Sequence, residues 1–218
     1  MATPTGQPDE HSTAPVGRRR VILLTGPSGA GKSRLAQRLS EAHGWPVVRL
    51  DDFYREGDDP HLPRSPLGIP DWDHVDSWNA EAACVALTRL VDEGDVDVPV
   101  YDIGASAVTG HHRLTAGPDA FVLAEGLFAG RLVTPLGDRG LLADALCIRQ
   151  NRLLTAVRRF ARDLSERRKP PWVLARRGLA LYRDEPHVIA QAEADGARCQ
   201  TPREAERRLA GALLRGSR

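Results

Sequence analysis

The chain has 218 residues and carries 30 lysines and arginines against 29 aspartates and glutamates, which gives a net charge of +1. This balance does not favour nucleic acid as a partner, and no apolar run approaches the about 18 residues that indicate a membrane span, so we expect no membrane partner. The length fits one α/β domain with a buried core.

The start of the chain is rich in Pro, Thr, Gly and Ser and lacks the apolar segment of a signal peptide. We therefore expect a disordered tail over residues 1–19 and a single domain over residues 20–218. Cys84, Cys147 and Cys199 lie far apart and without metal-ligand spacing, so we expect them to be core thiols. Reduced thiols indicate a cytoplasmic location.

Apolar periodicity predicts strands that alternate with helices along the domain. The predicted strands cover residues 21–25, 47–50, 96–100, 108–114, 120–124, 144–148 and 197–199, and the third and fourth of them form a hairpin. The predicted helices cover residues 34–43, 78–93, 151–166, 172–183 and a last segment that starts at Thr201. We expect Asp76 or Ser77 to cap the second helix, and Thr201 with Glu204 to form a capping box. This order predicts an α/β fold whose mostly parallel sheet is covered on both faces.

The most informative motif lies between the first predicted strand and helix. Its residues are Gly26, Pro27, Ser28, Gly29, Ala30, Gly31, Lys32 and Ser33, and they fit the phosphate-binding pattern G-x-x-x-x-G-K-[ST]. The glycines let backbone N–H groups point at phosphate oxygens, Lys32 bridges the outer phosphates, and Ser33 binds Mg²⁺. Only two of the 30 basic residues are lysines, Lys32 and Lys169, and a compact ammonium suits this position better than a planar guanidinium.

Three carboxylates follow predicted strands. Asp51 and Asp52 come after the second strand, and Glu125 after the strand at 120–124. Because ligands collect at the carboxyl ends of parallel strands, we expect these groups to lie near the glycine loop. Asp51 is the candidate general base, with Asp52 as the adjacent alternative. Glu125 suits a Mg²⁺ contact through water, and an N-cap-like role is its alternative.

A basic segment follows. Residues 152–183 contain ten basic and two acidic residues. Arg159 and Arg162 share a helix face, and Arg167 extends the group past the helix end. Such a segment can close as a lid over phosphates, or it can be a solvated helix face.

Six stretches, taken together and in order, resemble the uridine kinase branch of P-loop kinases, which also includes phosphoribulokinase. They are Gly26–Ser33, Asp51–Tyr54, Asp71–Trp78, Pro99–Asp102, Glu125–Gly126 and Arg158–Arg167, and they span about residues 21–169. The resemblance implies a P-loop NTPase fold, a three-layer sandwich with a small β-hairpin and a basic helical lid.

The resemblance also implies roles for individual residues. Asp51 takes the proton of the ribose 5′-hydroxyl, and Asp73 binds the ribose hydroxyls. The other substrate-binding residues that it implies are Trp72 beside sugar and base, Tyr54, Tyr101 on the hairpin, and Arg159. The catalytic set is completed by Lys32, Arg162 and the lid residue Arg167, and the metal contacts by Ser33 and Glu125.

These inferences predict a Mg²⁺-dependent kinase that uses ATP or GTP and phosphorylates a small acceptor. The first candidate is the 5′-hydroxyl of a pyrimidine nucleoside, uridine or cytidine. The chain departs from the family after Tyr101-Asp102: residues 103–107 contain no histidine where relatives carry one that contacts the pyrimidine, and the next are His111 and His112. The alternatives are a kinase of another metabolite, such as a sugar phosphate, vitamin precursor or antibiotic, and a nucleotide-binding regulatory ATPase. A homo-oligomer is compatible with the sequence.

Overall fold

The structure is a computed structural model that describes residues 19–65, 68–72, 74–151, 155, 183 and 185–216, with side chains up to residue 210. Apart from positions 19, 151, 155 and 183, several expected segments lie outside these residues. They are the tail at 1–19, the lid at 152–183 and the two helices at 151–166 and 172–183. None of the helices in the described ranges is long and apolar enough to cross a membrane.

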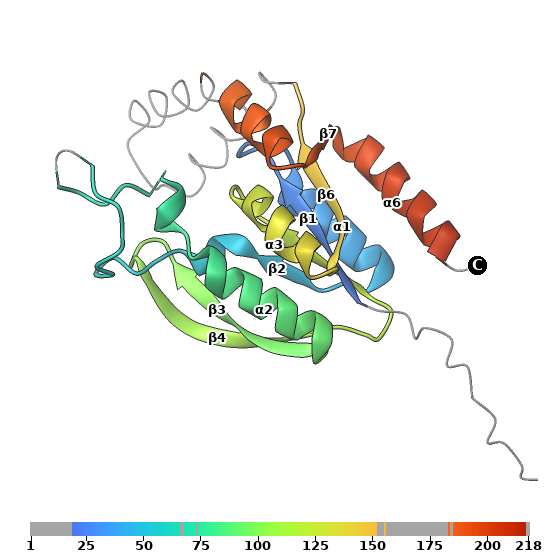
Figure 1. Ribbon diagram of the computed structural model, residues 1–218, viewed down its shortest axis with the longest axis horizontal. Helices are drawn as coiled ribbons and strands as arrows, with labels where there is room; N and C mark the ends of the chain where they lie inside the picture. Colours follow the sequence, from blue (N-terminus) through green and yellow to red (C-terminus); the bar gives the residue numbers. More distant parts are fainter. Residues whose placement is uncertain are drawn as a thin grey trace, which may run out of the picture.

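A five-stranded parallel sheet forms the centre of the molecule (Figure 1). Its order is β2-β5-β1-β6-β7, with β1 at Arg20–Thr25, β2 at Val47–Arg49, β5 at Phe121–Glu125, β6 at Leu142–Ile148 and β7 at Arg198–Gln200. The apolar run of β1 is fully buried because strands flank it on both sides and helices cover both faces. The predicted strands and their parallel arrangement are confirmed.

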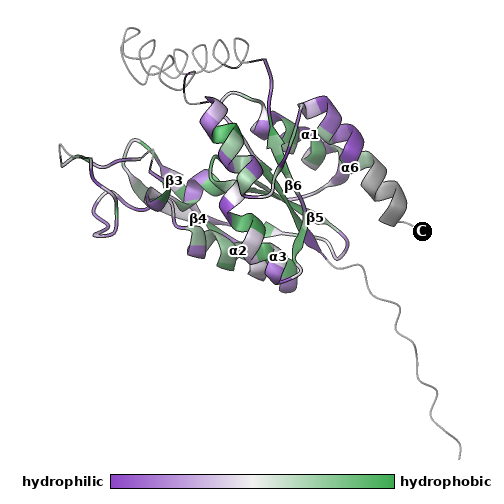
Figure 2. Ribbon diagram, turned by 45° about the horizontal axis from the view of Figure 1, so that its top comes forward, coloured by the Kyte–Doolittle hydropathy of each residue, from purple (hydrophilic) through white to green (hydrophobic). Residues whose placement is uncertain are grey.

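Helices cover both faces of this sheet. Alternate residues of β1 separate two cores: Ile22 and Leu24 pack toward α1 (Lys32–His43) and α6 (Pro202–Gly216), whereas Val21 and Leu23 pack toward α2 (Ala80–Asp92) and α3 (Val133–Asp138). Figure 2 shows the hydrophobic strands between these helix layers. The three-layer α/β sandwich expected from the sequence is therefore confirmed.

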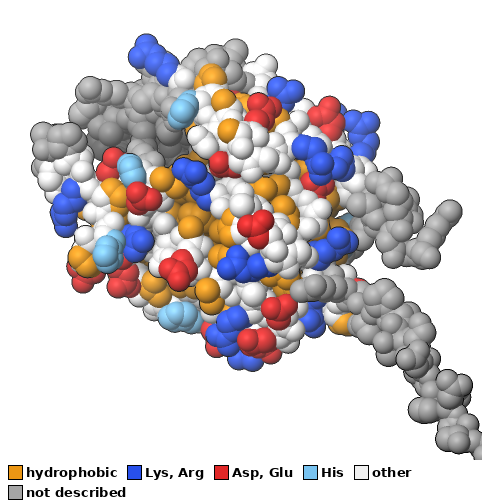
Figure 3. Space-filling view, viewed as in Figure 1, with side chains coloured by type: hydrophobic (Ala, Val, Ile, Leu, Met, Phe, Trp, Pro, Cys, Tyr) orange, Lys and Arg blue, Asp and Glu red, His pale blue; other side chains and the backbone are white. Residues whose placement is uncertain are grey.

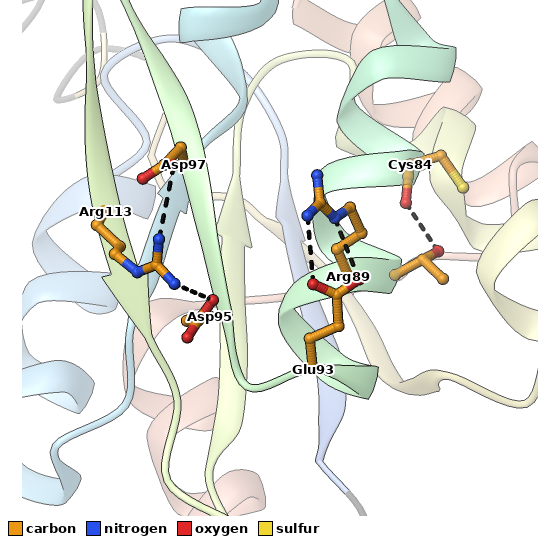
Figure 4. Close-up of polar contacts among 7 residues, drawn as sticks. Cys84, Arg89, Glu93, Asp95, Asp97 and Arg113 are labelled. Atoms are coloured by element: carbon orange, nitrogen blue, oxygen red, sulfur yellow. Dashed lines mark hydrogen bonds and ion pairs between the residues drawn. The ribbon is translucent and has the colours of Figure 1, made fainter.

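A β-hairpin packs beside α2 at the lower edge of Figure 1. It consists of β3 (Asp95–Asp102) and β4 (Ala107–Thr115), which pair antiparallel. Val96 and Val98 face the core, and on the exposed side Arg113 forms ion pairs with Asp95 and Asp97 (Figure 4). This arrangement places the turn between β3 and β4 near the carboxyl end of β2.

Several local predictions need correction. Asn79, and neither Asp76 nor Ser77, caps α2, because Val75–Ser77 forms a 3₁₀ turn and the helix starts after it. The second strand ends at Arg49, since Leu50–Phe53 turns into a 3₁₀ helix. The helical residues 129–132 and 133–138 were not predicted, because short segments that contain glycine and proline carry little helical periodicity. The helical residues 185–194 were not predicted either. Cys84 and Cys147 are buried and Cys199 is half-buried, and all three are free.

The capping box of α6 gives a first prediction. The Thr201 backbone N–H and hydroxyl donate to Glu204 Oε2 at 2.8 and 2.9 Å, and the former is the main reason why the pKa of Glu204 is lowered. A carboxylate whose pKa is lower in the folded than in the unfolded protein stabilises the fold at pH values above its unfolded pKa. This contribution to stability is lost as the pH falls through the pKa of the folded protein. We expect Glu204→Ala to lower the melting temperature at pH 7, and the difference from wild type to narrow below about pH 4.

Thermal unfolding of both proteins between pH 3 and pH 8 measures this effect. Arg203→Ala changes an exposed residue of the same helical turn and serves as the control. A difference between Glu204→Ala and wild type that is independent of pH would contradict the capping role of the Glu204 carboxylate.

Candidate active site

The glycine loop lies between β1 and α1, as the motif requires. At Gly26 the backbone has φ +123°, and a Cβ atom there would lie 2.4 Å from the Ile148 carbonyl oxygen, so only glycine fits. Helix α1 starts after Gly31, and no side chain caps its N-terminus. Its first backbone N–H groups are therefore available to an anion such as phosphate.

Lys32 is held inside the loop. Its ammonium donates hydrogen bonds to the carbonyl oxygens of Gly26 at 2.8 Å and Pro27 at 3.2 Å, and the residue is only 9% exposed. A charge in this position faces the space that the loop encloses. The role of Lys32 as a phosphate-binding cation stays a prediction.

Ser33 and Glu125 meet at the carboxyl end of the sheet. The Ser33 hydroxyl donates to Glu125 Oε1 at 3.0 Å, and Glu125 is 7% exposed. Burial raises the pKa of Glu125, the nearby Lys32 ammonium opposes this shift, and the Asp51 carboxylate adds to it. A hydroxyl and a carboxylate are the oxygen ligands that Mg²⁺ takes together with phosphate and water. In the described part of the chain no group of three or more His, Cys, Asp or Glu could hold a metal ion, so any Mg²⁺ here depends on such further ligands.

Asp51 and Asp52 have different surroundings. Asp51 is exposed and lines a cavity with Ser33 and Glu125, whereas Asp52 is 6% exposed and lies under the hairpin. Asp52 accepts a hydrogen bond from the Tyr101 backbone N–H at 3.4 Å, and burial is the main reason why its pKa is raised. Of the two carboxylates, Asp51 is therefore the one that can reach a bound molecule.

The cavity next to the glycine loop has a volume of about 630 Å³. It opens on the α1 side of the sheet, between one stripe of α1 and the end of β2. Its lining residues include Ser28 and Ser33 of the loop, Gln37, Ser40 and Glu41 of α1, Val47 and Arg49 of β2, and Asp51, Ile103 and Glu125. The cavity thus brings together the loop, the carboxylates of Asp51 and Glu125, and the hairpin turn.

Gly126 sets the distance between the end of β5 and the turn that carries Asp51. A Cβ atom at Gly126 would lie 2.8 Å from Leu50 Cβ and 3.3 Å from Asp51 Oδ1. The absence of a side chain therefore allows the end of β5 to approach the turn that carries Asp51. Sequence reasoning paired Gly126 with Glu125 only as part of a motif, without this packing role.

Three of the aromatic residues expected to bind substrate lie together. The ring centroid of Tyr54 is 6.2 Å from that of Trp72 and 6.1 Å from that of Tyr101. Tyr54 also packs against Phe128 at 6.3 Å, and the Tyr101 hydroxyl donates to the Arg55 carbonyl oxygen at 2.9 Å. These rings form a packed group beside Asp52, and none of the three lines the cavity. Asp73, Arg159, Arg162 and Arg167 lie outside the described residues.

Arg49 and Ile103 line the cavity but were not predicted as site residues. Strand alternation carried a signal for Arg49, because Val47 and Arg49 point to the same face of β2. Ile103 had no such signal, since its place depends on how the hairpin turn folds back toward β2. Away from the cavity, Figure 3 shows acidic and basic side chains interspersed over the described part of one face.

Comparisons with known proteins show what the sequence is similar to. Residues 21–89 match the family described as AAA domain. Uridine-cytidine kinase 2-B from Danio rerio is 31% identical over 163 residues, which make up 67% of this chain and 59% of that protein. The chain thus spans less than two thirds of the length of this curated relative.

One solved structure shares the fold, and a second is less similar. A provisionally assigned fructose transport system kinase from Silicibacter sp. TM1040 is 19% identical with a TM-score of 0.56, over 88% of this chain and 90% of that one. A possible uridine kinase from Bacillus stearothermophilus is 18% identical with a TM-score of 0.48, over 71% of this chain and 83% of that one. The chain therefore contains a P-loop domain in a P-loop NTPase-like α/β fold, and it is distantly homologous to a uridine-cytidine kinase.

Proposed function

We propose that the chain is a kinase that transfers the γ-phosphoryl group of ATP or GTP to a hydroxyl of a small acceptor. The observation that carries this proposal is the single cavity that contains the glycine loop, the Ser33–Glu125 pair and the exposed carboxylate of Asp51. A phosphoryl-transfer site needs a phosphate-binding loop, metal ligands and a group that orients the attacking hydroxyl. The residues proposed for these three parts follow the neighbouring strands β1, β5 and β2.

In this proposal Lys32 and the N-terminus of α1 bind the outer phosphates, and Asp51 accepts the proton of the acceptor hydroxyl. Ser33, and Glu125 through water, hold Mg²⁺, which neutralises charge on the phosphates. Asp73 fixes the acceptor, and Arg159, Arg162 and Arg167 stabilise the transferring group. The last four are proposals from the family resemblance alone.

The first candidate acceptor is a pyrimidine nucleoside, because the curated relative is a uridine-cytidine kinase and the Tyr54–Trp72–Tyr101 rings lie beside the Asp51–Asp52 turn. Another hydroxylated metabolite is the second candidate. It is favoured by Ile103, an aliphatic residue that lines the cavity on the hairpin turn, because none of the described residues that line the cavity is a histidine.

A screen of acceptors by coupled ADP release tests the proposal. Uridine, cytidine, sugar phosphates and other hydroxylated metabolites are offered with Mg²⁺ and either ATP or GTP, and the product is identified by mass spectrometry. Turnover with a nucleoside supports the first candidate, and turnover with another metabolite alone supports the second. Nucleotide hydrolysis that no acceptor changes would argue against a kinase and for a regulatory ATPase.

Gly126→Ala gives a prediction for the acceptor side. The added Cβ atom needs space that Leu50 and Asp51 occupy, so the turn that carries Asp51 has to move. Because small displacements of a reacting group are costly, we expect kcat to fall by about tenfold to a hundredfold, with little change in nucleotide affinity. Steady-state kinetics and nucleotide titration measure the two effects.

Gly137→Ala is the matched control, because no atom lies within 4 Å of a Cβ atom at that position. This variant is expected to keep the wild-type kcat. Equal kcat values for the Gly126→Ala protein and this control would show that the approach of β5 to Asp51 is unimportant for turnover.

A further inference from the structure

Arg49 is a basic residue in a cavity that otherwise contains hydroxyl, amide, carboxylate and aliphatic side chains. It lies at the end of β2, its side chain is 65% exposed, and it lines the same cavity as Ser28, Ser33 and Asp51. Its register partner in the sheet is Glu125. Arg49 thus brings a positive charge to the place where the loop and the strand-end carboxylates meet.

The guanidinium of Arg49 has N–H donors that are available to a ligand. Its one ion pair within the described residues is with Asp52, where Nε lies 3.7 Å from Oδ2, which is beyond hydrogen-bond distance. A guanidinium carries five N–H donors in a planar fork that matches two phosphate oxygens. Asp52 itself is held from the other side by the Tyr101 backbone N–H. Arg49 can therefore turn toward a ligand without leaving a buried partner unbonded.

We propose that Arg49 binds a phosphate group inside this cavity. This inference rests on the proposed kinase function, because it uses the same cavity. The carboxylates of Glu41, Asp51 and Glu125 also line the cavity and repel an anion, so the phosphate needs positive charge on the side of β2 as well as from Lys32 and Mg²⁺. Arg49 supplies that charge from a strand, independently of the segment at 152–183.

Two sources can supply the phosphate. It is either the γ-phosphate of the bound nucleotide or a phosphate carried by the acceptor itself. These two phosphates lie at different positions relative to the glycine loop. An experiment can distinguish them by filling the loop with a nonhydrolysable ATP analogue.

Equilibrium binding to purified protein tests the proposal. The variants are Arg49→Gln, Arg49→Lys, Asp52→Asn and the control Arg89→Gln, and the probes are ADP, the ATP analogue AMP-PNP and inorganic phosphate, all with Mg²⁺. Arg89 lies on α2, is 57% exposed and pairs with Glu93 at 3.2 Å, so it matches Arg49 in exposure and pairing (Figure 4). Asp52→Asn removes the ion pair of Arg49 but keeps its guanidinium, and it separates phosphate binding from a structural role.

If the phosphate is the γ-phosphate, Arg49→Gln weakens the binding of AMP-PNP by about tenfold relative to the binding of ADP. A loss of about tenfold is the scale of one charge-assisted hydrogen bond. If it belongs to the acceptor, the AMP-PNP to ADP ratio is unchanged, and the affinity of inorganic phosphate for the AMP-PNP-loaded protein falls by about tenfold. In both cases Arg49→Lys restores part of the affinity, and Asp52→Asn does not lower it.

The proposal is overturned if Arg49→Gln and Arg89→Gln give the same AMP-PNP to ADP ratio while phosphate binding to the loaded protein is absent or equal in both. It is also overturned if Asp52→Asn reproduces the loss seen with Arg49→Gln, because Arg49 then acts only through its ion pair. These measurements need no turnover, so they remain readable if the acceptor screen finds no substrate and the kinase proposal fails.

Discussion

Asp51→Asn is expected to lower kcat by about two to four orders of magnitude, the usual contribution of a general base, while the dissociation constant for ATP stays nearly unchanged. An amide has the shape of the carboxylate but cannot accept the proton of the acceptor hydroxyl. Asp51 is exposed in the cavity, so this substitution leaves the fold intact. Steady-state kinetics with an acceptor found by the screen, nucleotide titration and a thermal melt measure the three quantities.

Asp52→Asn is the matched variant for this experiment. Asp52 is buried under the hairpin, and an asparagine oxygen can still accept the Tyr101 N–H bond, so we expect a much smaller loss of kcat. Burial raises the pKa of Asp52 because it disfavours the charged form of the carboxyl group. A larger loss of kcat for Asp52→Asn than for Asp51→Asn would reverse the assignment of the base.

The layered fold could be predicted because its signals are local. A buried parallel strand such as β1 is a continuous apolar run, and the amphipathic stripe of α1 follows the helical period, so each element is visible in a short window of sequence. The cap of α2 could not be predicted in this way. Asp76, Ser77 and Asn79 are all good capping residues, and the 3₁₀ turn at 75–77, which depends on contacts of the loop before α2, decides among them.

The glycine loop was more predictable than the rest of the cavity for a related reason. The glycine loop binds phosphate with backbone groups and adjacent residues, so its pattern is contained in eight positions. The cavity beyond it combines α1, β2, β5 and the hairpin turn, which are distant in sequence. Asp51 and Glu125 were found because both follow strands, whereas Arg49 and Ile103 needed the packing of those elements to be known.

The choice between Asp51 and Asp52 shows what the structure adds. In the sequence the two aspartates are equivalent neighbours after a strand. In the fold, the 3₁₀ turn at Leu50–Phe53 sends one carboxylate into the cavity and the other beneath Tyr101. The same turn is where Gly126 makes its closest approach, so the position of Asp51 depends on two strands at once.

Lys32→Ala is expected to lower kcat/KM by about two orders of magnitude or more, and by the same factor for every acceptor. The ammonium is the buried cation of the loop and bonds the carbonyl oxygens of Gly26 and Pro27, so its loss removes charge from the phosphate site and also loosens the loop. It also removes the charge that counters burial at Glu125, whose pKa then rises further and whose carboxylate becomes a weaker partner for Mg²⁺.

Kinetics with two chemically different acceptors, together with titration of ATP and ADP, measure the effect of this substitution. Lys32→Arg keeps the charge but brings a planar guanidinium into a position that is only 9% exposed, so we expect it to remain impaired as well. Because Lys32 acts on the donor, its loss weakens ATP binding, in contrast to Asp51→Asn. A defect confined to one acceptor, or an ATP affinity equal to that of wild type, would place Lys32 outside the phosphate site and remove the basis of the donor half of the proposal.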